Sequence, residues 1–344
     1  MKITIDATVF GRQKFGGVSE YLNQLLNHVS KKNNFTLVKP LKPMRVMTEN
    51  HKKFHSITQT VLSHYTRGFT QCRINKSADV FHTPYYSIPN VKVKNYVTTV
   101  HDFTYEFYKA GLKSKFHVFQ KHRSIREADN IICVSNNTKN DLLNFFPTLD
   151  EKVIRVIPLG VDREVFYPEL LPENRWMNDQ VLFVGRREEY KRFDLAINSV
   201  SEVPELRLGI VGPRLNSDEI NKLEEKLKGR YNLFESIDEK ALRQLYSSSF
   251  ALIFPSQYEG FGLPLIEAMS CGLPVIAPYA HAFKEVGKNA YIHVEMQTPE
   301  AYKLELEKLM ISSNRDDIVK KGLVNCEDFS WGQMAEKTFD VYSQ

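Results

Sequence analysis

Cysteine is scarce in this sequence of 344 residues, and the four that occur, Cys72, Cys133, Cys271 and Cys326, are scattered. No C-x-x-C pair exists, so the sequence predicts neither a disulfide-stapled domain nor a cysteine zinc site. Apolar runs are of strand length and fall short of the roughly 18–20 residues that a membrane-spanning helix needs. The first residues, Met1–Asp6, carry charge and no long apolar core, which argues against a signal peptide. We therefore expect reduced thiols and a cytoplasmic protein.

Several motifs of phosphate, metal and nucleophile chemistry are also missing. The sequence has no Walker A loop, no H-E-x-x-H, no G-x-S-x-G and no G-x-G-x-x-G. Nucleoside triphosphatases, zinc proteases, serine hydrolases with a nucleophile elbow and dinucleotide-dependent oxidoreductases are therefore unsupported. The composition, 42% hydrophobic and 25% charged, is ordinary for a globular protein, and the length suggests two domains.

Strand-length apolar runs alternate with amphipathic helical patterns in two series that are broken near residue 170. This alternation predicts two parallel sheets, each covered by helices on both faces, and hence an α/β chain of two doubly wound domains facing across a cleft. We expect domains at residues 1–165 and 166–329, with a closing helix at 330–344. Residues 40–77 do not fit the alternation, and the pattern there is compatible with a helix, a mobile flap or both. The predicted strands are Ile3–Ala7, Phe35–Val38, Asp79–His82, Tyr96–His101, Asn130–Ser135 and Val153–Pro158, then Val181–Gly185, Arg207–Val211, Leu233–Ser236, Phe250–Pro255 and Pro274–Ala277.

Charge is divided unevenly between the two halves. Residues 1–168 contain 25 Lys and Arg against 13 Asp and Glu, a net +12, and the remaining residues have 21 against 28, a net −7. A basic first half suits an anionic partner such as a membrane surface, a phosphorylated acceptor or nucleic acid. A solvated basic face without a partner is the equally weighted alternative.

The most informative stretch surrounds Glu259 and Glu267. A buried strand ends at Pro255, a loop with Gly260 and Gly262 follows, and a helix is expected to begin at Pro264. In parallel α/β sheets ligands bind beyond the carboxyl ends of strands, and glycines let the backbone approach a ligand and adopt positive φ. A helix start also offers unpaired N–H groups to an anion. The two carboxylates, eight positions apart, are expected to converge on one pocket and to bind a vicinal diol.

These residues, E-G-F-G-L-P-L-I-E-A-M from Glu259 to Met269, resemble the E-x7-E motif of retaining glycosyltransferases of family 4, which have the GT-B fold. The resemblance implies that Glu267 holds the ribose of a nucleotide sugar. It assigns Glu259 to the sugar and phosphate side, together with the loop residues Gly260, Phe261, Gly262 and Leu263.

A second stretch resembles the G-R…K-G element of the same family, whose Arg and Lys hold the donor diphosphate. The matching positions are Arg186 and Lys191, which follow the first strand of the second domain. Two cations would neutralise the leaving group as the glycosidic bond breaks. The chain departs from the family at Arg192, where glycine is usual, and Arg187 and Arg192 remain alternatives for the same task.

The first domain contributes two further candidates. Gly16 and Gly17, after the first strand, resemble the family's G-G-V loop, which faces the donor phosphates and the acceptor. His101, followed by Asp102 at a strand end, resembles the His-Asp that family members have at the reaction centre. We place His101 among the catalytic residues with Glu259, Arg186 and Lys191, and His82 is a weaker candidate.

Three other segments fit the resemblance. Ile157–Asp162 resembles the family's crossover between domains, and the tail around Trp331 resembles its C-terminal helix, which packs back on the first domain. Ser236 and Ile237 occupy the place where family members bind the nucleobase. Metal-dependent glycosyltransferases use a D-x-D motif, and the nearest stretch, Asp316–Asp317, lies in a charged helical pattern. We therefore expect no metal.

The resemblance thus implies a retaining, metal-independent glycosyltransferase that moves a hexosyl unit from a nucleoside-diphosphate sugar to an acceptor hydroxyl. The form of the motif resembles bacterial polysaccharide mannosyltransferases, which makes GDP-mannose the first donor candidate and UDP-hexoses the next. A glycan or lipid-linked acceptor and a peripheral membrane contact through the basic first domain are expected. The alternatives are an epimerase or phosphorylase of the same fold, a non-catalytic sugar-nucleotide binder and a nucleic-acid-binding protein, although no nucleic-acid recognition module is recognisable.

Overall fold

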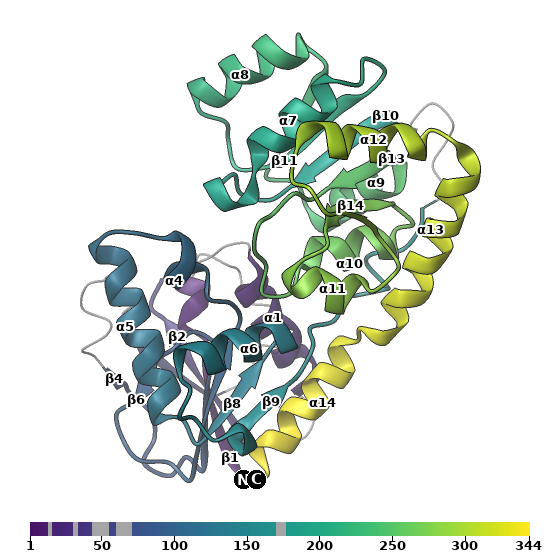
Figure 1. Cartoon of the computed structure of the whole chain (residues 1–344). Coiled ribbons are helices and arrows are strands. Elements are labelled where there is room, and N and C mark those ends of the chain that lie inside the picture. Colours follow the sequence, from purple (N-terminus) through teal and green to yellow (C-terminus); the bar gives the residue numbers. More distant parts are fainter. Residues whose placement is uncertain (13–15, 30–33, 43–54, 60–70, 170–176) are drawn as a thin grey trace. The chain divides into compact units, whose positions relative to one another are not determined.

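The computed structural model describes residues 1–12, 16–29, 34–42, 55–59, 71–169 and 177–344. The chain forms two compact units (Figure 1). Unit 1 comprises Met1–Gly160 and Ser330–Gln344, and unit 2 comprises Val161–Phe329. The chain therefore leaves unit 1 once and returns to it with its last helix.

The centre of unit 1 is a seven-stranded parallel sheet in the order β3-β2-β1-β5-β7-β8-β9. Ile5 of β1 lies opposite Leu37 of β2 on one side and His82 of β5 on the other, so the strand order reverses at β1. The strands are β1 (Lys2–Asp6), β2 (Asn34–Pro40), β3 (His55–Gln59), β5 (Val80–Thr83), β7 (Asn95–Val100), β8 (Asn130–Cys133) and β9 (Ile154–Val156), with a separate small pair of β4 (Gln71–Cys72) and β6 (Ile88–Pro89).

Helices follow most strands of unit 1. The helix α6 illustrates how the local sequence sets a boundary, because the Ser135 hydroxyl accepts the Thr138 N–H at 3.0 Å and so caps the helix start. The helices are α1 (Gly17–Val29), α4 (Thr104–Tyr108), α5 (Leu112–Glu127), α6 (Asn136–Phe145) and α14 (Trp331–Tyr342), with short 3-10 turns at Thr8–Gly11 and Glu151–Val153.

The returning helix α14 is part of the core of unit 1. Tyr342 Oη lies 2.6 Å from Nδ1 of His82, and the Asn95 side chain donates to the Val341 carbonyl at 2.8 Å. The approach is closest at Gly160, where an added Cβ would lie 2.2 Å from the main-chain nitrogen of Trp331. Glycine is therefore required where the chain passes the start of this helix.

Unit 2 contains a six-stranded parallel sheet in the order β12-β11-β10-β13-β14-β15. The order reverses at β10, where Leu182 lies opposite Gly209 of β11 and Leu252 of β13. The carboxyl ends of β10 and β13 are therefore neighbours at the topological switch point. The strands are β10 (Met177–Val184), β11 (Arg207–Gly212), β12 (Tyr231–Glu235), β13 (Ser249–Ile253), β14 (Val275–Pro278) and β15 (Ile292–Val294).

The helices of unit 2 cover this sheet on both faces. The helix α8 begins with a capping box, in which Asn216 accepts the Glu219 N–H at 2.9 Å and Glu219 accepts the Asn216 N–H at 2.8 Å. The helices are α7 (Phe193–Ser201), α8 (Ser217–Leu227), α9 (Glu239–Ser248), α10 (Leu263–Ser270), α11 (His281–Gly287), α12 (Pro299–Leu309) and α13 (Ser312–Asn325), with 3-10 turns at Glu189–Lys191 and Cys326–Asp328.

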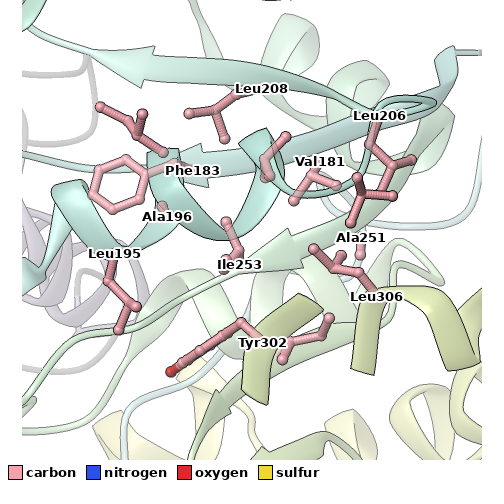
Figure 2. Close-up of a cluster of buried hydrophobic side chains, with 14 of the residues drawn as sticks. Val181, Phe183, Leu195, Ala196, Leu206, Leu208, Ala251, Ile253, Tyr302 and Leu306 are labelled. Atoms are coloured by element: carbon pink, nitrogen blue, oxygen red, sulfur yellow. The ribbon is translucent and has the colours of Figure 1, made fainter. Parts of the chain in front are cut away.

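A continuous apolar cluster fills the space between the sheet of unit 2 and its helices (Figure 2). Val181 and Phe183 of β10 meet Ala196 of α7, and Tyr302 and Leu306 of α12 belong to the same cluster. Each such buried side chain contributes about 1.5–3 kcal/mol of transfer free energy. This packing fixes β10 and β13, and it thereby fixes the loops that follow them.

The predicted fold class is confirmed: two parallel α/β sheets form a GT-B fold. Every predicted strand has a counterpart, but strands β3, β4, β6 and β15 and helices α4 and α11–α13 were not predicted. In the segment 40–77, residues 55–59 and 71–72 form strands, and residues 43–54 and 60–70 lie outside the described part of the chain.

Candidate active site

Two loops of unit 2 meet beyond the carboxyl ends of β10 and β13. The first loop runs from Gly185 to Arg192, and the second runs from Phe254 to Gly262. The N–H of Gln257 donates to the carbonyl of Tyr190 at 2.8 Å, which joins the two loops directly. Lys191 and Glu259, 68 positions apart in the chain, are thereby held together at one edge of the sheet.

The contact that defines this place is an ion pair between Lys191 and Glu259. The two side chains are only 17% and 14% exposed, and Lys191 Nζ lies 5.7 Å from the ring centre of Phe254. A cation and a carboxylate predicted from separate motifs are thus in direct contact. Because they are partly shielded from water, their electrostatic interaction with a ligand is stronger than at an open surface.

The start of α10 lies next in the chain. Gly262, the residue before the helix, has φ 95° and ψ 55°, a left-handed conformation that strains any residue with a Cβ. Gly260 is outside that region, so the expected positive φ holds for one of the two glycines. Phe261 is buried with its ring edge-to-face against Phe329 at 5.7 Å, and Leu263 is half-buried. The helix starts one residue earlier than predicted; Pro264 has no N–H, and the Leu265 N–H donates to the Gly262 carbonyl at 2.9 Å.

Glu267 is half-buried near the end of the first turn of α10. Its Oε2 accepts a hydrogen bond from the Tyr246 hydroxyl of α9 at 3.2 Å. Burial raises the pKa of Tyr246 well above its usual range, and the charge of Glu267 acts in the same direction, so the phenol remains a donor. Tyr246, which sequence reasoning missed, therefore orients Glu267, whereas Glu259 is held by Lys191.

The three arginines that follow β10 have different roles. Arg187 is fixed: its Nε donates to Glu219 at 2.7 Å and its Nη2 donates to the carbonyls of Pro213 and Arg214 at 2.8 and 2.9 Å. It joins the loop after β10 to the loop after β11 and to α8. Arg186 is exposed, and among the described residues no carboxylate pairs with it. Of the arginines that the sequence offers for holding the diphosphate, Arg187 is therefore a structural residue, whereas Arg186 is accessible to a ligand.

Arg192, where glycine is expected from the family pattern, adopts the glycine conformation nonetheless. Its φ of 52° and ψ of 45° are left-handed, and it directly precedes α7. The turn is therefore preserved despite a side chain that disfavours it.

We expect Arg192→Gly to raise the free energy of unfolding of unit 2 by about 1 kcal/mol, because glycine adopts the left-handed conformation without a steric penalty. Chemical denaturation checks this value. Lys228→Gly is a matched control, since Lys228 is also left-handed, at φ 49° after α8. A loss of stability for Arg192→Gly alone would mean that its side chain contributes more than the backbone strain costs.

Ser236 and Ile237 follow β12. Ser236 is exposed and left-handed at φ 54°, and Ile237 is half-buried just before α9. Because β12 is the edge strand and β11 separates it from β10, this loop is not adjacent in the sheet to the two loops that carry Lys191 and Glu259. The nucleobase assignment remains a prediction.

In unit 1, His101 directly follows β7. It is 8% exposed, and its ring meets that of Tyr21 edge-to-face at 5.0 Å. Among the described residues its Nε2 atom has no hydrogen-bond partner. Burial lowers the pKa of His101 to about 4, with Asp102 opposing the shift and Lys121 adding to it, so the ring is neutral at pH 7.

The weaker candidate His82 has a different environment. It is fully buried, and its nitrogens lie 2.6 Å from Tyr342 Oη and 2.8 Å from Thr99 Oγ1. Burial lowers its pKa to about 3. Both nitrogens are engaged within the core of unit 1, so His82 is a structural residue.

Gly16 and Gly17 lie where β1 leads into α1. Gly17 is the first residue of α1, and the Gly16 carbonyl accepts the Ser19 hydroxyl at 2.8 Å. Residues 13–15 of this predicted loop lie outside the described part of the chain. The structure thus gives the helix start and leaves the ligand role of the glycines a prediction.

Two findings concern metals and membranes. Nowhere in the described ranges do three or more His, Cys, Asp or Glu side chains gather as metal ligands. The described helices include none with an apolar stretch long enough to span a bilayer.

Comparison with known families agrees with the fold and the motifs. Residues 15–165 match the family described as Glycosyltransferase Family 4, and residues 172–322 match Glycosyl transferases group 1. The chain is a family 4, group 1 glycosyltransferase. The resemblance seen in the sequence is therefore confirmed, and the protein is an enzyme of the glycosyltransferase class.

Curated relatives of this glycosyltransferase include the O-antigen chain mannosyltransferase B of Escherichia coli, which is 25% identical over 76% of this chain and 74% of its own length. The α-maltose-1-phosphate synthase of Mycolicibacterium smegmatis is 26% identical over 64% of each chain, just under two thirds. Among solved structures, sucrose-phosphate synthase from Thermosynechococcus elongatus has a TM-score of 0.78 at 19% identity, covering 100% of this chain and 98% of its own. The Anabaena protein HepE, solved with UDP and glucose, has a TM-score of 0.75 at 14% identity, covering all of both chains.

Proposed function

We propose that this glycosyltransferase moves a hexosyl unit, with retention of anomeric configuration and without a metal ion, from a nucleoside-diphosphate sugar to a hydroxyl of a glycan or lipid-linked acceptor. The observation that carries the proposal is the shielded pair of Lys191 and Glu259, which lies where β10 and β13 end and just before the start of α10. A cation and a carboxylate beside the positive end of a helix dipole are groups that suit a sugar diphosphate.

Each residue has a proposed task. Lys191 and Arg186 neutralise the diphosphate, Glu259 and the loop from Gly260 to Leu263 hold the sugar side, and Glu267 holds the ribose hydroxyls. When the donor binds, the Lys191 ammonium then leaves the Glu259 carboxylate and pairs with the donor phosphate.

The transfer step balances without an enzymic nucleophile. The bond between the anomeric carbon and the phosphate oxygen breaks, and a bond from that carbon to the acceptor oxygen forms on the same face. The acceptor proton passes to the departing phosphate oxygen. Cations aimed at that oxygen stabilise the charge that develops on it. His101, neutral with Nε2 available, is proposed to hydrogen-bond the transferred sugar or to place the acceptor.

Our first donor candidate is GDP-mannose, supported by the mannosyltransferase among the relatives. A UDP-hexose is the alternative, supported by the structural neighbour solved with UDP-glucose. The basic first half of the chain supports an anionic acceptor at a membrane surface, with peripheral contact through unit 1.

The test is a thermal-unfolding screen with GDP, UDP, GDP-mannose and UDP-glucose, followed by transfer of radiolabelled sugar. We expect one nucleotide class to stabilise the chain by about 2.7 kcal/mol at 100 times its dissociation constant. Glu267→Gln should weaken that nucleotide roughly tenfold or more, since a hydrogen bond to a charged group contributes about 1.5–3 kcal/mol.

The control is Glu225→Gln, which removes an acid with a 70% exposed side chain from the same unit. An unchanged nucleotide affinity in Glu267→Gln would refute the ribose assignment. Binding without any transfer would instead support a non-catalytic sugar-nucleotide binder, and isomerisation or phosphorolysis of the donor would indicate another reaction on this fold.

A further inference from the structure

A fully buried lysine lies inside unit 1, behind the His101 turn. The Lys121 side chain, in the middle of α5, is 2% exposed, and that of Glu106 on α4 is 3% exposed. Lys121 Nζ lies 3.1 Å from both carboxylate oxygens of Glu106, and His122 Nε2 lies 3.2 Å from one of them. Because removing two charges from water costs several kcal/mol each, a buried ion pair is poor evidence for stability alone. Its presence therefore calls for another explanation.

A second contact of Lys121 explains why the buried pair is present. Its Nζ also donates to the main-chain carbonyl of Asp102, the residue directly after His101. The Asp102 carboxylate in turn accepts the N–H of Thr104 at 2.9 Å, where α4 begins. The ammonium thus joins α5 and α4 to the end of β7, and it holds the peptide between Asp102 and Phe103, one residue beyond His101.

Packing holds the His101 side chain, but its hydrogen-bonding capacity is not fully used among the described residues. Tyr21 packs edge-to-face on its ring, while its buried Nε2 atom has no partner among the described residues. A buried polar atom without a hydrogen bond is costly, so a ligand that supplies the bond is favoured. The orientation of this nitrogen depends on the His101–Asp102 turn, which Lys121 anchors at the Asp102 carbonyl and the Thr138 hydroxyl anchors at the His101 carbonyl, at 3.4 Å.

Building on the proposed function, we propose that Lys121 is a positioning residue, whose buried ammonium holds the Asp102 carbonyl so that Nε2 of His101 faces the transferred sugar or the acceptor. The charges around the ring are consistent with this role. Asp102 beside it and Lys121 from α5 oppose each other, and the other titratable groups that face the turn are Tyr21 from α1, His82 from β5 and Tyr86, which bonds the His101 main chain. Lys121 therefore adds to the effect of burial, which lowers the pKa of the His101 ring.

The test compares Lys121→Met/Glu106→Gln, which removes both charges of the pair, with Glu106→Gln alone, in which Lys121 keeps the Asp102 carbonyl and the nearby Asp102 carboxylate. Glu106→Gln is expected to be the less stable of the two, because its buried ammonium loses the Glu106 carboxylate. We expect both to fold and to keep the nucleotide affinity measured on unit 2. The double variant should lose kcat roughly 10- to 100-fold with little change in the donor KM, as small misplacements of reacting groups do. Glu106→Gln should stay within a few-fold of the native kcat.

A second readout does not depend on turnover. With ¹³C-labelled histidine, NMR titration should show the pKa of His101 higher in the double variant than in the native chain, with His101→Ala identifying the resonance. Lys115→Met, an exposed position on the same helix, should change neither property.

A double variant with native kcat and an unchanged His101 titration would overturn the inference, as would Glu106→Gln if it lost as much kcat as the double variant. Full activity in His101→Ala would refute the proposed role of His101 instead. A native chain that transfers no sugar from any donor would refute the proposed function, and the NMR titration would still decide whether Lys121 controls His101.

Discussion

Lys191→Met is expected to lower kcat by roughly 10²–10³-fold, the typical cost of removing one preorganised group that stabilises transition-state charge. Met keeps the unbranched, apolar stem of the side chain near Phe254 and Tyr190, so the loss of kcat measures mainly the loss of the charge. The reaction builds negative charge on the leaving diphosphate, and with Lys191 absent only Arg186 remains of the two proposed cations. Steady-state kinetics with the donor identified in the nucleotide screen measures the effect.

The ion pair itself complicates that variant, because Lys191→Met leaves the half-shielded Glu259 carboxylate without its cation. Lys191→Met/Glu259→Gln removes both charges and separates stability from catalysis by a double-mutant cycle. Lys303→Met is the matched control, since Lys303 also pairs with a glutamate in unit 2 but on the exposed surface of α12. A Lys191→Met enzyme within a few-fold of the native kcat would place the diphosphate elsewhere.

Much of the candidate site in unit 2 was predictable because its signals are local. The strand that ends at Ile253, the left-handed Gly262 and Pro264 in the first turn of α10 all lie within about one turn of the residues they position. The periodicity of apolar runs likewise predicts two parallel sheets. It does not predict that Lys191 contacts Glu259, because that contact depends on the strand order.

What the sequence could not predict depends on distant contacts. The histidine at position 82 has the same strand-end context as His101, but Tyr342, 260 residues away, binds it into the core. Arg187 and Arg186 are adjacent in the chain, and the contacts with Glu219 and with the loop after β11 distinguish the structural one. Lys121 lies in a polar helical pattern that resembles a solvated face, so its burial becomes visible only when α4 and β7 are placed beside it.

Acid is expected to destabilise unit 1 by about 4 kcal/mol between pH 7.5 and pH 5, relative to a chain whose histidines titrate normally. Burial lowers the pKa of His82 to about 3 and that of His101 to about 4, whereas both have an ordinary value of 6.5 when unfolded. Below pH 6.5 the unfolded chain therefore binds two protons that the folded chain does not. The stabilisation is fully present above pH 6.5 and is lost as pH falls toward the folded values, at about 1.4 kcal/mol per pH unit for each histidine.

Urea unfolding at pH 5 to 7.5, followed by the fluorescence of the buried Trp331, measures this effect, with Trp176→Phe removing the other tryptophan. His82→Gln removes one titrating group while it keeps a donor and an acceptor for Tyr342 and Thr99. Its unfolding free energy should fall with acid at about half the native slope, because only His101 still contributes. If the unfolding free energy fell with acid equally steeply in both proteins, His82 would take up its proton without unfolding. Its hydrogen bonds to Tyr342 and Thr99 would then not require the neutral ring.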